Sequence, residues 1–162
     1  MKRVAVYPGT FDPVTNGHLD LVDRARRHFD EVVVSILRNT NKQPLFVLDE
    51  RVGFLKDAVA DWDGVKVEAF DGLLVDHCRQ IGASVILRGL RAISDFEYEM
   101  QAAMMNRKLE PNVETIFLLP GEAYSYLSSN LVREIGRLGG DIDQLVPAHV
   151  SEAMKRRFGK QD

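Results

Sequence analysis

The sequence contains little that would anchor the chain, crosslink it or charge it strongly. Its one cysteine, Cys78, cannot form an internal disulfide, and with only His77 beside it there is no set of metal ligands. No apolar run approaches the roughly 20 residues that cross a bilayer, and the first residues lack a charged and apolar targeting segment. The net charge is −3, so no global basic field exists to hold nucleic acid. We therefore expect a cytoplasmic protein that binds neither a membrane nor nucleic acid.

Several motifs of nucleotide and hydrolase chemistry are also absent. The chain has no G-x-x-x-x-G-K-[ST] and no G-x-G-x-x-G after a strand, which argues against P-loop NTPases and Rossmann dehydrogenases. It has no G-x-S-x-G, the turn that carries the nucleophile of α/β-hydrolases. No cluster of carboxylates could hold two metals, so we expect no metal ligands among the side chains.

What the sequence does contain is an alternation of β-branched apolar runs with amphipathic stretches. Its 162 residues suit one domain with one core, which we expect to span residues 1–162. Strands are expected at residues 4–7, 31–37, 65–70, 85–87 and 114–119. Helices are expected to begin near residue 15 and to follow at 48–59, after 72 to about 80, at 94–108, from the serines at 128–129 to 138, and at 151–158. The helix over 94–108 has an apolar stripe formed by Phe96, Met100, Ala103 and Met104. This alternation predicts an α/β fold with a doubly wound sheet of about five parallel strands.

The junction between the first strand and the first helix has the features of a phosphate site. Free backbone N–H groups at the start of a helix favour an anion, and Gly9 and Gly17 allow a close approach. His18 falls in the first helical turn, where its imidazole can lean over the same pocket. Each residue also has a purely structural interpretation: Thr15 as an N-cap, Gly17 as a tolerated helix residue, Asp12 as an Asx-turn residue and His18 as a surface histidine.

Polar residues also follow most of the other strands. The set that we expect at one edge of the sheet is Thr10, His18, Lys42, Arg88, Arg91 and Ser128 to Asn130. Taken alone, Lys42 is equally compatible with a solvated surface charge. Gly89 between two arginines at a strand end instead suggests a ligand nearby, and arginine forks match phosphate oxygens. The pattern predicts a polyanion site with three cations and a histidine.

The motifs together resemble a known family. T-x-G-H at Thr15 to His18 resembles the T/H-x-G-H signature of the nucleotidylyltransferase superfamily. Nearly the whole chain resembles the bacterial phosphopantetheine adenylyltransferases. The segments that carry this likeness are Y-P-G-T-F-D-P-V-T-N-G-H at residues 7–18, the lysine at 42, R-G-L-R at 88–91, D-F-E-Y-E at 95–99 and Y-S-Y-L-S-S-N at 124–130.

The resemblance implies a Rossmann-like nucleotidyltransferase fold and a specific reaction. In that family the adenylyl group of ATP passes to 4′-phosphopantetheine, which gives dephospho-coenzyme A and pyrophosphate in the penultimate step of coenzyme A synthesis. The resemblance further implies a cytoplasmic homohexamer, Mg²⁺ carried with ATP, and coenzyme A as a feedback inhibitor. Magnesium on the triphosphate would keep several of its waters.

The same resemblance assigns roles to individual residues. It implies catalytic roles for His18, Lys42 and Arg91, with His18 hydrogen-bonding the α-phosphate as charge builds. It implies that phosphopantetheine is held by Thr10, Lys42, Leu74 and Arg88. It implies that ATP is held by Thr10, Phe11, His18, Gly89, Leu90, Arg91, Glu99, Tyr124, Ser125, Tyr126, Leu127, Ser128, Ser129 and Asn130. Asn130 departs from the family, which commonly has S-S-S or S-S-T in this segment.

The chemistry of such a transfer agrees with these residue types. The attacking phosphate is already ionised at neutral pH, so no general base is needed, and the difficulty is that two anions must meet. Cations and a helix N-terminus can spread the developing charge during in-line attack. Two alternatives remain at this point: another T-x-G-H enzyme, such as a cytidylyl or nicotinamide-mononucleotide transferase, and a non-enzymatic ATP-binding sensor.

Overall fold

The computed structural model describes residues 1–38, 43–91 and 93–159. Its strands form one parallel five-stranded sheet in the order β3-β2-β1-β4-β5. The strand bounds are β1 Val4–Gly9, β2 Glu31–Leu37, β3 Val65–Phe70, β4 Val85–Gly89 and β5 Glu114–Leu118. The predicted α/β fold with five parallel strands is confirmed, and β1 and β4 each extend two residues beyond the prediction.

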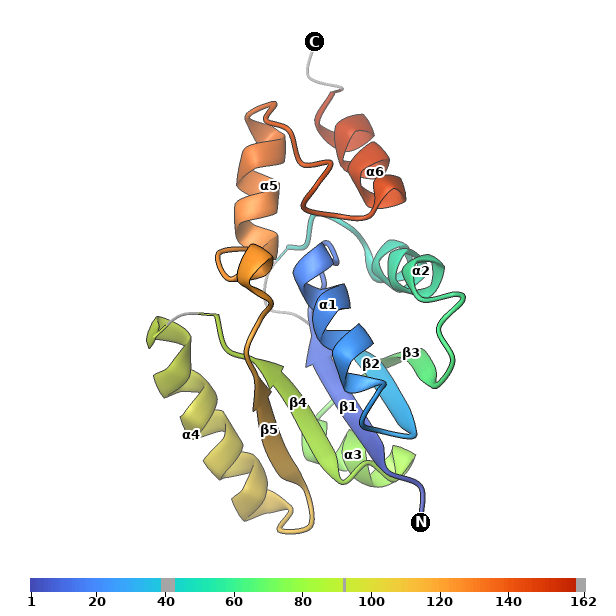
Figure 1. The fold of residues 1–162 in the computed structure, drawn as a ribbon, viewed down its shortest axis with the longest axis vertical. Helices are drawn as coiled ribbons and strands as arrows, with labels where there is room; N and C mark the ends of the chain where they lie inside the picture. Colours follow the sequence, from blue (N-terminus) through green and yellow to red (C-terminus); the bar gives the residue numbers. More distant parts are fainter. Residues whose placement is uncertain (39–42, 92, 160–162) are drawn as a thin grey trace.

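Along the chain, helices alternate with the strands as the sequence pattern predicts, and two further α-helices follow the last strand (Figure 1). Their bounds are α1 Asn16–Ala25, α2 Leu48–Ala58, α3 Leu74–Ile81, α4 Ile93–Leu109, α5 Ser129–Arg137 and α6 Ala148–Phe158, with a short 3-10 helix, η1, at Glu122–Tyr124. Helix α6 begins three residues earlier than predicted, directly after Pro147, which has no N–H to leave unpaired there. Figure 1 shows α5 and α6 beyond the strand ends, away from the N-terminus.

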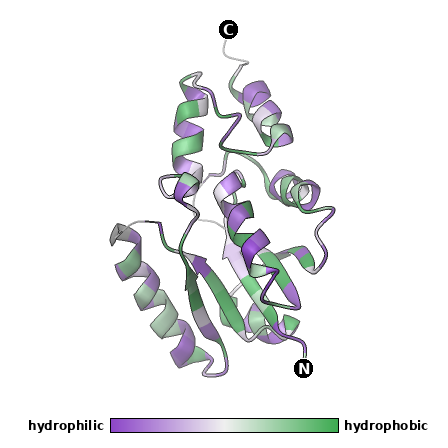
Figure 2. Ribbon diagram, in the orientation of Figure 1, coloured by the Kyte–Doolittle hydropathy of each residue, from purple (hydrophilic) through white to green (hydrophobic). Residues whose placement is uncertain are grey.

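The two faces of the sheet are buried against different helices. On one face, Ala5 and Tyr7 of β1 join a cluster that includes Val22 of α1 and Leu55 of α2. On the other face, Val4 and Val6 of the same strand contact a smaller cluster that includes Cys78 of α3. Strand side chains alternate between faces, so a strand covered on both sides must be apolar at nearly every position. The central strands β1 and β4 are accordingly green over much of their length in Figure 2, and the purple parts lie toward their carboxyl ends.

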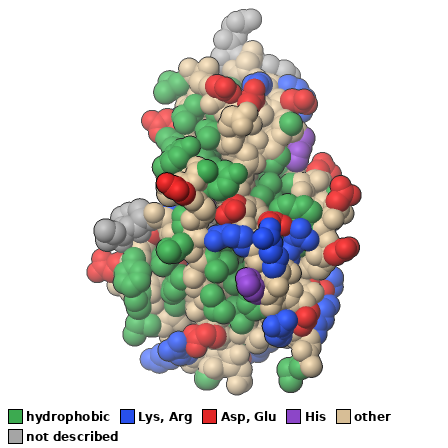
Figure 3. Space-filling model, viewed as in Figure 1, with side chains coloured by type: hydrophobic (Ala, Val, Ile, Leu, Met, Phe, Trp, Pro, Cys, Tyr) green, Lys and Arg blue, Asp and Glu red, His purple; other side chains and the backbone are tan. Residues whose placement is uncertain are grey.

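The apolar stripe expected on α4 is largely exposed. Phe96, Met100 and Met104 are 46%, 38% and 65% exposed, and Met105 beside them is 53% exposed. Helix α4 contacts β5 and α3 at the sheet edge, and within the described residues nothing packs over its outer face. Figure 3 shows hydrophobic side chains at the surface over this helix. Separately, no helix in the described ranges has the length and apolarity needed to span a membrane.

The strand order creates a crevice at one place in the sheet. The chain moves from β1 to β2 and β3 on one side, and then returns to place β4 and β5 on the other side of β1. Strands β1 and β4 are therefore neighbours whose following segments separate in opposite directions. In open parallel sheets, ligands bind outside the carboxyl ends of the strands at such a switch point.

Candidate active site

A cavity of about 380 Å³ opens at this switch point. Its lining includes most of the residues predicted from the sequence: Thr10, Phe11, His18, Arg88, Gly89, Arg91, Glu99, Tyr124, Leu127, Ser128, Ser129 and Asn130. The volume is typical of small-molecule sites. Residues from the segments after β1, β4 and β5 thus meet in one place, as the alternation of strands and helices predicts.

The start of α1 holds His18 by a reciprocal pair of hydrogen bonds. The Thr15 backbone N–H donates to Nδ1 of His18 at 3.0 Å, and the His18 backbone N–H donates to Oγ1 of Thr15 at 3.3 Å. This is a capping box with histidine in place of the usual glutamate or glutamine. Because Nδ1 accepts from an amide, the neutral ring carries its proton on Nε2. The structural interpretation of Thr15 as an N-cap is therefore correct, and it also orients His18.

Aromatic packing and nearby charges keep this imidazole neutral. The ring of Phe11 meets it edge-on at a centroid distance of 5.0 Å, and the Tyr7 ring lies 6.3 Å away. Desolvation, together with the positive charges of Arg91 and Arg88, lowers the pKa of His18 to about 3. Burial likewise raises the pKa of Tyr7 to about 12. At neutral pH, His18 is therefore a hydrogen-bond donor through Nε2 and carries no charge.

Arg88 points into the cavity with its guanidinium braced by Glu99. Nε of Arg88 donates to Oε2 of Glu99 at 2.8 Å, Nη2 donates to Oε1 at 2.5 Å, and Nη1 donates to the Pro8 carbonyl at 3.1 Å. Burial alone lowers the pKa of Arg88, but the hydrogen bonds and charge of Glu99 outweigh it and the pKa is raised. Both carboxylate oxygens of Glu99 thus accept hydrogen bonds from Arg88. The role of Glu99 at the cavity is therefore to hold the guanidinium of Arg88 in place.

Arg91 and the segment before α5 form another wall of the cavity. Nη1 of Arg91 donates to the Leu127 carbonyl at 3.1 Å, and its Nε lies 3.5 Å from Oδ2 of Asp95. Ser128 caps α5 by accepting from the Leu131 N–H, and Ser129 donates its hydroxyl to the Pro13 carbonyl at 2.7 Å. The start of α5 therefore faces the same cavity as the start of α1, and two helix N-termini favour negative charge there.

Asn130 has a partner within this wall. Its Oδ1 accepts a hydrogen bond from Arg133, which is one helical turn further along α5 and also lines the cavity. The asparagine that stands where the family commonly has serine or threonine is thus hydrogen-bonded to an arginine of the same wall.

Some predicted residues lie away from the cavity lining. Leu74, at the start of α3, packs against the smaller cluster on the other face of the sheet. Leu90, Ser125 and Tyr126 are not part of the lining, and Tyr126 is 65% exposed. Lys42 lies outside the described residues, so its predicted role stays a prediction.

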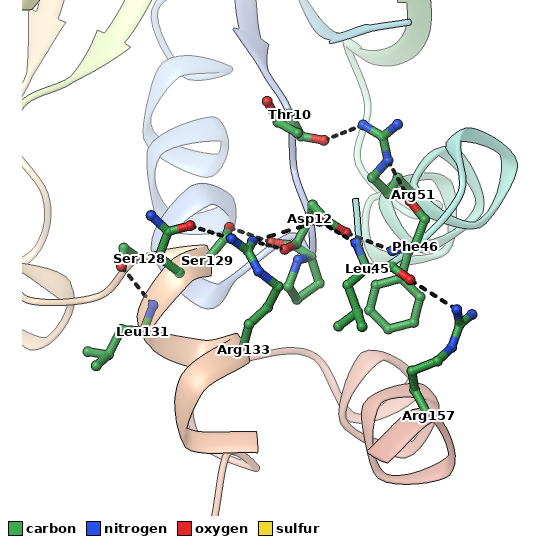
Figure 4. A network of polar contacts seen from close by, with 12 residues as sticks. Thr10, Asp12, Leu45, Phe46, Arg51, Ser128, Ser129, Leu131, Arg133 and Arg157 are labelled. Atoms are coloured by element: carbon green, nitrogen blue, oxygen red, sulfur yellow. Dashed lines mark hydrogen bonds and ion pairs between the residues drawn. The ribbon is translucent and has the colours of Figure 1, made fainter. Parts of the chain in front are cut away.

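The structure adds residues that were not predicted to be in the site. Asp12, Arg51 and Arg133 form a polar network behind the Thr10 segment, and Asp12 and Arg133 also line the cavity (Figure 4). Arg51 could have been noticed, because the helical spacing of Leu48, Arg51 and Leu55 puts it on the buried face of α2. For Asp12 the sequence offers an Asx-turn residue only as the structural alternative, and nothing local indicates its partners Leu45 and Phe46.

The carboxylates around the cavity are already engaged. Asp12 accepts from backbone N–H groups, Asp95 pairs with Arg91, and Glu99 pairs with Arg88. Among the described residues, no group of three His, Cys, Asp or Glu side chains could hold a metal ion.

Comparison with known proteins agrees with this geometry. A model of the cytidylyltransferase-like family matches residues 6–135. The chain is 55% identical to the phosphopantetheine adenylyltransferase of Thioalkalivibrio sulfidiphilus over 159 residues, which cover 98% of this chain and 100% of that protein. It is 54% identical to the protein of the same name from Methylococcus capsulatus over 158 residues, 98% of each chain.

A solved structure shares the fold at much lower identity. The bifunctional NMN adenylyltransferase/ADP ribose pyrophosphatase of Francisella tularensis has a TM-score of 0.74 at 15% identity, over 99% of this chain and 51% of that one. This chain thus spans about half of that protein, and the likeness shows the Rossmann-like fold. The family expected from the motifs is confirmed by the curated relatives. The chain belongs to the phosphopantetheine adenylyltransferase family of nucleotidyltransferase enzymes.

Proposed function

We propose that this chain transfers the adenylyl group of ATP to 4′-phosphopantetheine and releases pyrophosphate and dephospho-coenzyme A. A phosphate oxygen of the acceptor forms the new bond to the α-phosphorus, and the bond to the leaving pyrophosphate breaks in line with it. The observation that carries this proposal is the start of α1, where an uncharged His18 with its proton on Nε2 lines the cavity together with Arg88 and Arg91.

In this reaction each group at the cavity supports negative charge. His18 donates its Nε2–H to the α-phosphate, where charge develops in the transition state. Arg88 and Arg91 offer guanidinium donors to phosphate oxygens of the acceptor and of ATP. No side chain needs to remove a proton from the nucleophile, because the acceptor phosphate is ionised at neutral pH. Catalysis here consists of placing two anions in line and stabilising their charge.

Magnesium fits this site as a companion of ATP. Bound to the triphosphate, it would neutralise part of the charge on the leaving pyrophosphate. The pocket carboxylates Asp12, Asp95 and Glu99 are engaged with other groups, so the chain's own contribution is to bind the phosphates with its arginines and helix N-termini.

The exposed face of α4 supports assembly into the homohexamer of the family. Phe96, Met100, Met104 and Met105 form a contiguous apolar surface of a kind that monomers seldom expose. A second copy of the chain would remove it from water. We propose that the chain acts in the cytoplasm, where ATP is available, and that coenzyme A competes for the cavity because it contains the pantetheine portion of the acceptor.

Pyrophosphate release under defined substrates tests the proposed reaction. The assay supplies Mg²⁺ and ATP with and without 4′-phosphopantetheine, and replaces ATP by CTP or the acceptor by nicotinamide mononucleotide in parallel. We expect release only with ATP and 4′-phosphopantetheine together. Release with CTP or with nicotinamide mononucleotide would instead identify another T-x-G-H transferase. Tight ATP binding without release under any acceptor would identify a nucleotide sensor.

A further inference from the structure

The segment Thr10–Pro13 after β1 is held almost entirely by side chains and backbone from elsewhere (Figure 4). The carboxylate of Asp12 accepts from the Leu45 N–H at 2.8 Å and from the Phe46 N–H at 2.9 Å. Nη1 of Arg51 donates to the Thr10 carbonyl at 2.8 Å, and its Nε donates to the Phe46 carbonyl at 3.1 Å. These four hydrogen bonds join the segment after β1 to the segment before α2.

The two joined segments form neighbouring walls of the cavity. Thr10 and Phe11 line it from the segment after β1, and Gln43 and Pro44 line it from the segment before α2. Phe11 has a φ of +48°, a conformation that a bulky residue adopts only when its surroundings impose it. The separation of these two walls therefore depends on the contacts between the segments.

The two side chains that make these contacts are deeply buried. Arg51 is 2% exposed and Asp12 is 5% exposed. Their charges support each other, and Arg133 adds a third charge, with Nη1 2.5 Å from the Asp12 carbonyl and 3.8 Å from Oδ2. Removing one member would leave a buried charge without its counterpart, which proteins tolerate poorly. The arrangement is therefore sensitive to substitution of any one of the three residues.

We propose that Asp12 and Arg51 are positioning residues, which fix the distance between the two walls so that the acceptor phosphate meets the α-phosphorus in line. This inference rests on the proposed adenylyl transfer. Both side chains form their hydrogen bonds with backbone groups of the protein. They therefore act on the substrates only by holding Thr10 and the segment before α2 in position. A shift of about 1 Å at a reacting centre can lower the rate about 100-fold.

Two conservative variants test the role. Asp12→Asn keeps the size of the side chain but replaces one carboxylate oxygen by an NH2 group. The Leu45 and Phe46 N–H groups donate to different oxygens of Asp12, so one of them loses its acceptor. Arg51→Lys keeps the charge but lacks the planar fork that reaches two carbonyls. We expect kcat to fall about 100-fold in each variant, with KM for either substrate changed by less than about threefold. Amide hydrogen exchange of Leu45 and Phe46 should accelerate in Asp12→Asn.

Val150→Ala serves as the matched control. Val150 is fully buried in α6 and does not line the cavity. The variant should lose thermal stability, while the donors and acceptors of the four hydrogen bonds between the two segments stay unchanged, because none of them lies in α6. All proteins are assayed at a temperature where circular dichroism shows them folded. The proposal holds if kcat falls in both test variants while Val150→Ala keeps its kcat and the exchange protection of Leu45 and Phe46.

Three results would overturn the inference in distinguishable ways. If the wild type releases no pyrophosphate, adenylyl transfer is refuted and the positioning role falls with it. If the wild type is active and both test variants keep kcat within about twofold, only the positioning role is refuted. If Val150→Ala loses as much kcat as the test variants at a similar loss of melting temperature, the two residues act on stability alone.

Discussion

Replacement of His18 tests the central idea that a neutral imidazole donates one hydrogen bond to the reacting phosphate. In the folded protein, Nδ1 of His18 is occupied by the Thr15 N–H, so only the Nε2–H is available to a ligand. Removing one preorganised donor of this kind costs about 3 kcal/mol of transition-state stabilisation, or about 100- to 1000-fold in kcat. His18→Ala should therefore lower kcat by that factor.

Ground-state binding of ATP should change much less. Arg91 and the N-termini of α1 and α5 remain in His18→Ala, so we expect its dissociation constant for ATP to stay within about threefold of wild type. Pyrophosphate release gives kcat, and calorimetric titration gives the ATP affinity. His28→Ala is the control, because His28 lies outside the cavity lining and is exposed. Equal losses of kcat and of ATP affinity would refute the transition-state role.

The pH dependence adds a second test of the same hydrogen bond. With a pKa of about 3 in the free protein, His18 is already neutral above pH 5 and should add no limb to kcat/KM between pH 6 and 9. Substrate phosphates titrate near pH 6, so the profile is compared with that of His18→Gln, which offers an amide N–H and cannot titrate. If His18 were a charged acid, kcat/KM would fall as pH rises through its pKa, and His18→Gln would lack that limb. Such a difference would contradict the neutral donor.

Three further outcomes follow from the packing. Glu99→Gln removes the charge that pairs with the partly buried Arg88. We expect a loss of about 2 kcal/mol in unfolding free energy, typical of a hydrogen bond to a charged group, and a raised KM for 4′-phosphopantetheine. An unchanged urea midpoint would contradict this. Burial lowers the pKa of His77, whose neutral ring is hydrogen-bonded to Ser35 Oγ at 2.9 Å. The neutral form therefore stabilises the fold above the unfolded pKa of about 6.5, and that stability is lost as pH falls below this value. Urea unfolding at pH 7 and pH 5 should show a smaller acid loss in the double variant Ser35→Ala, His77→Phe. Met104→Lys places a charge on the exposed apolar face of α4. If the proposed homohexamer forms through this face, the variant should have a lower sedimentation coefficient than the wild type while the monomer stays folded; an unchanged coefficient would exclude that face as the interface.

Local patterns explain why much of the site could be predicted. The strands are apolar at nearly every position because helices cover both faces, and that pattern is visible in the sequence. The capping box lies within four residues, so Thr15 and His18 could be identified together. Since the carboxyl ends of parallel strands meet at one edge, the residues that follow them were expected to converge, and Arg88 and Arg91 do so.

The contacts that could not be predicted join residues far apart in the chain. Asp12 accepts from Leu45, 33 residues later, and Arg51 donates to Thr10, 41 residues earlier. Their partners are backbone N–H and carbonyl groups, which every residue type carries and which leave no mark in the sequence. The pairing of Glu99 with Arg88 was missed for a different reason, because the role of Glu99 was inferred from family likeness alone.

The sequence by itself determined the order of strands and helices, the strand-loop-helix junction that carries Thr15 and His18, and the membership of the family. The tertiary structure decided which charged residues line the cavity, such as Arg91, and which are buried behind its lining, such as Arg51. It also decided that the apolar stripe of α4 is exposed, since an apolar helix face has the same sequence pattern whether it packs on its own sheet or on another subunit. Periodicity is a property of neighbouring residues, whereas burial and charge pairing depend on distances in space.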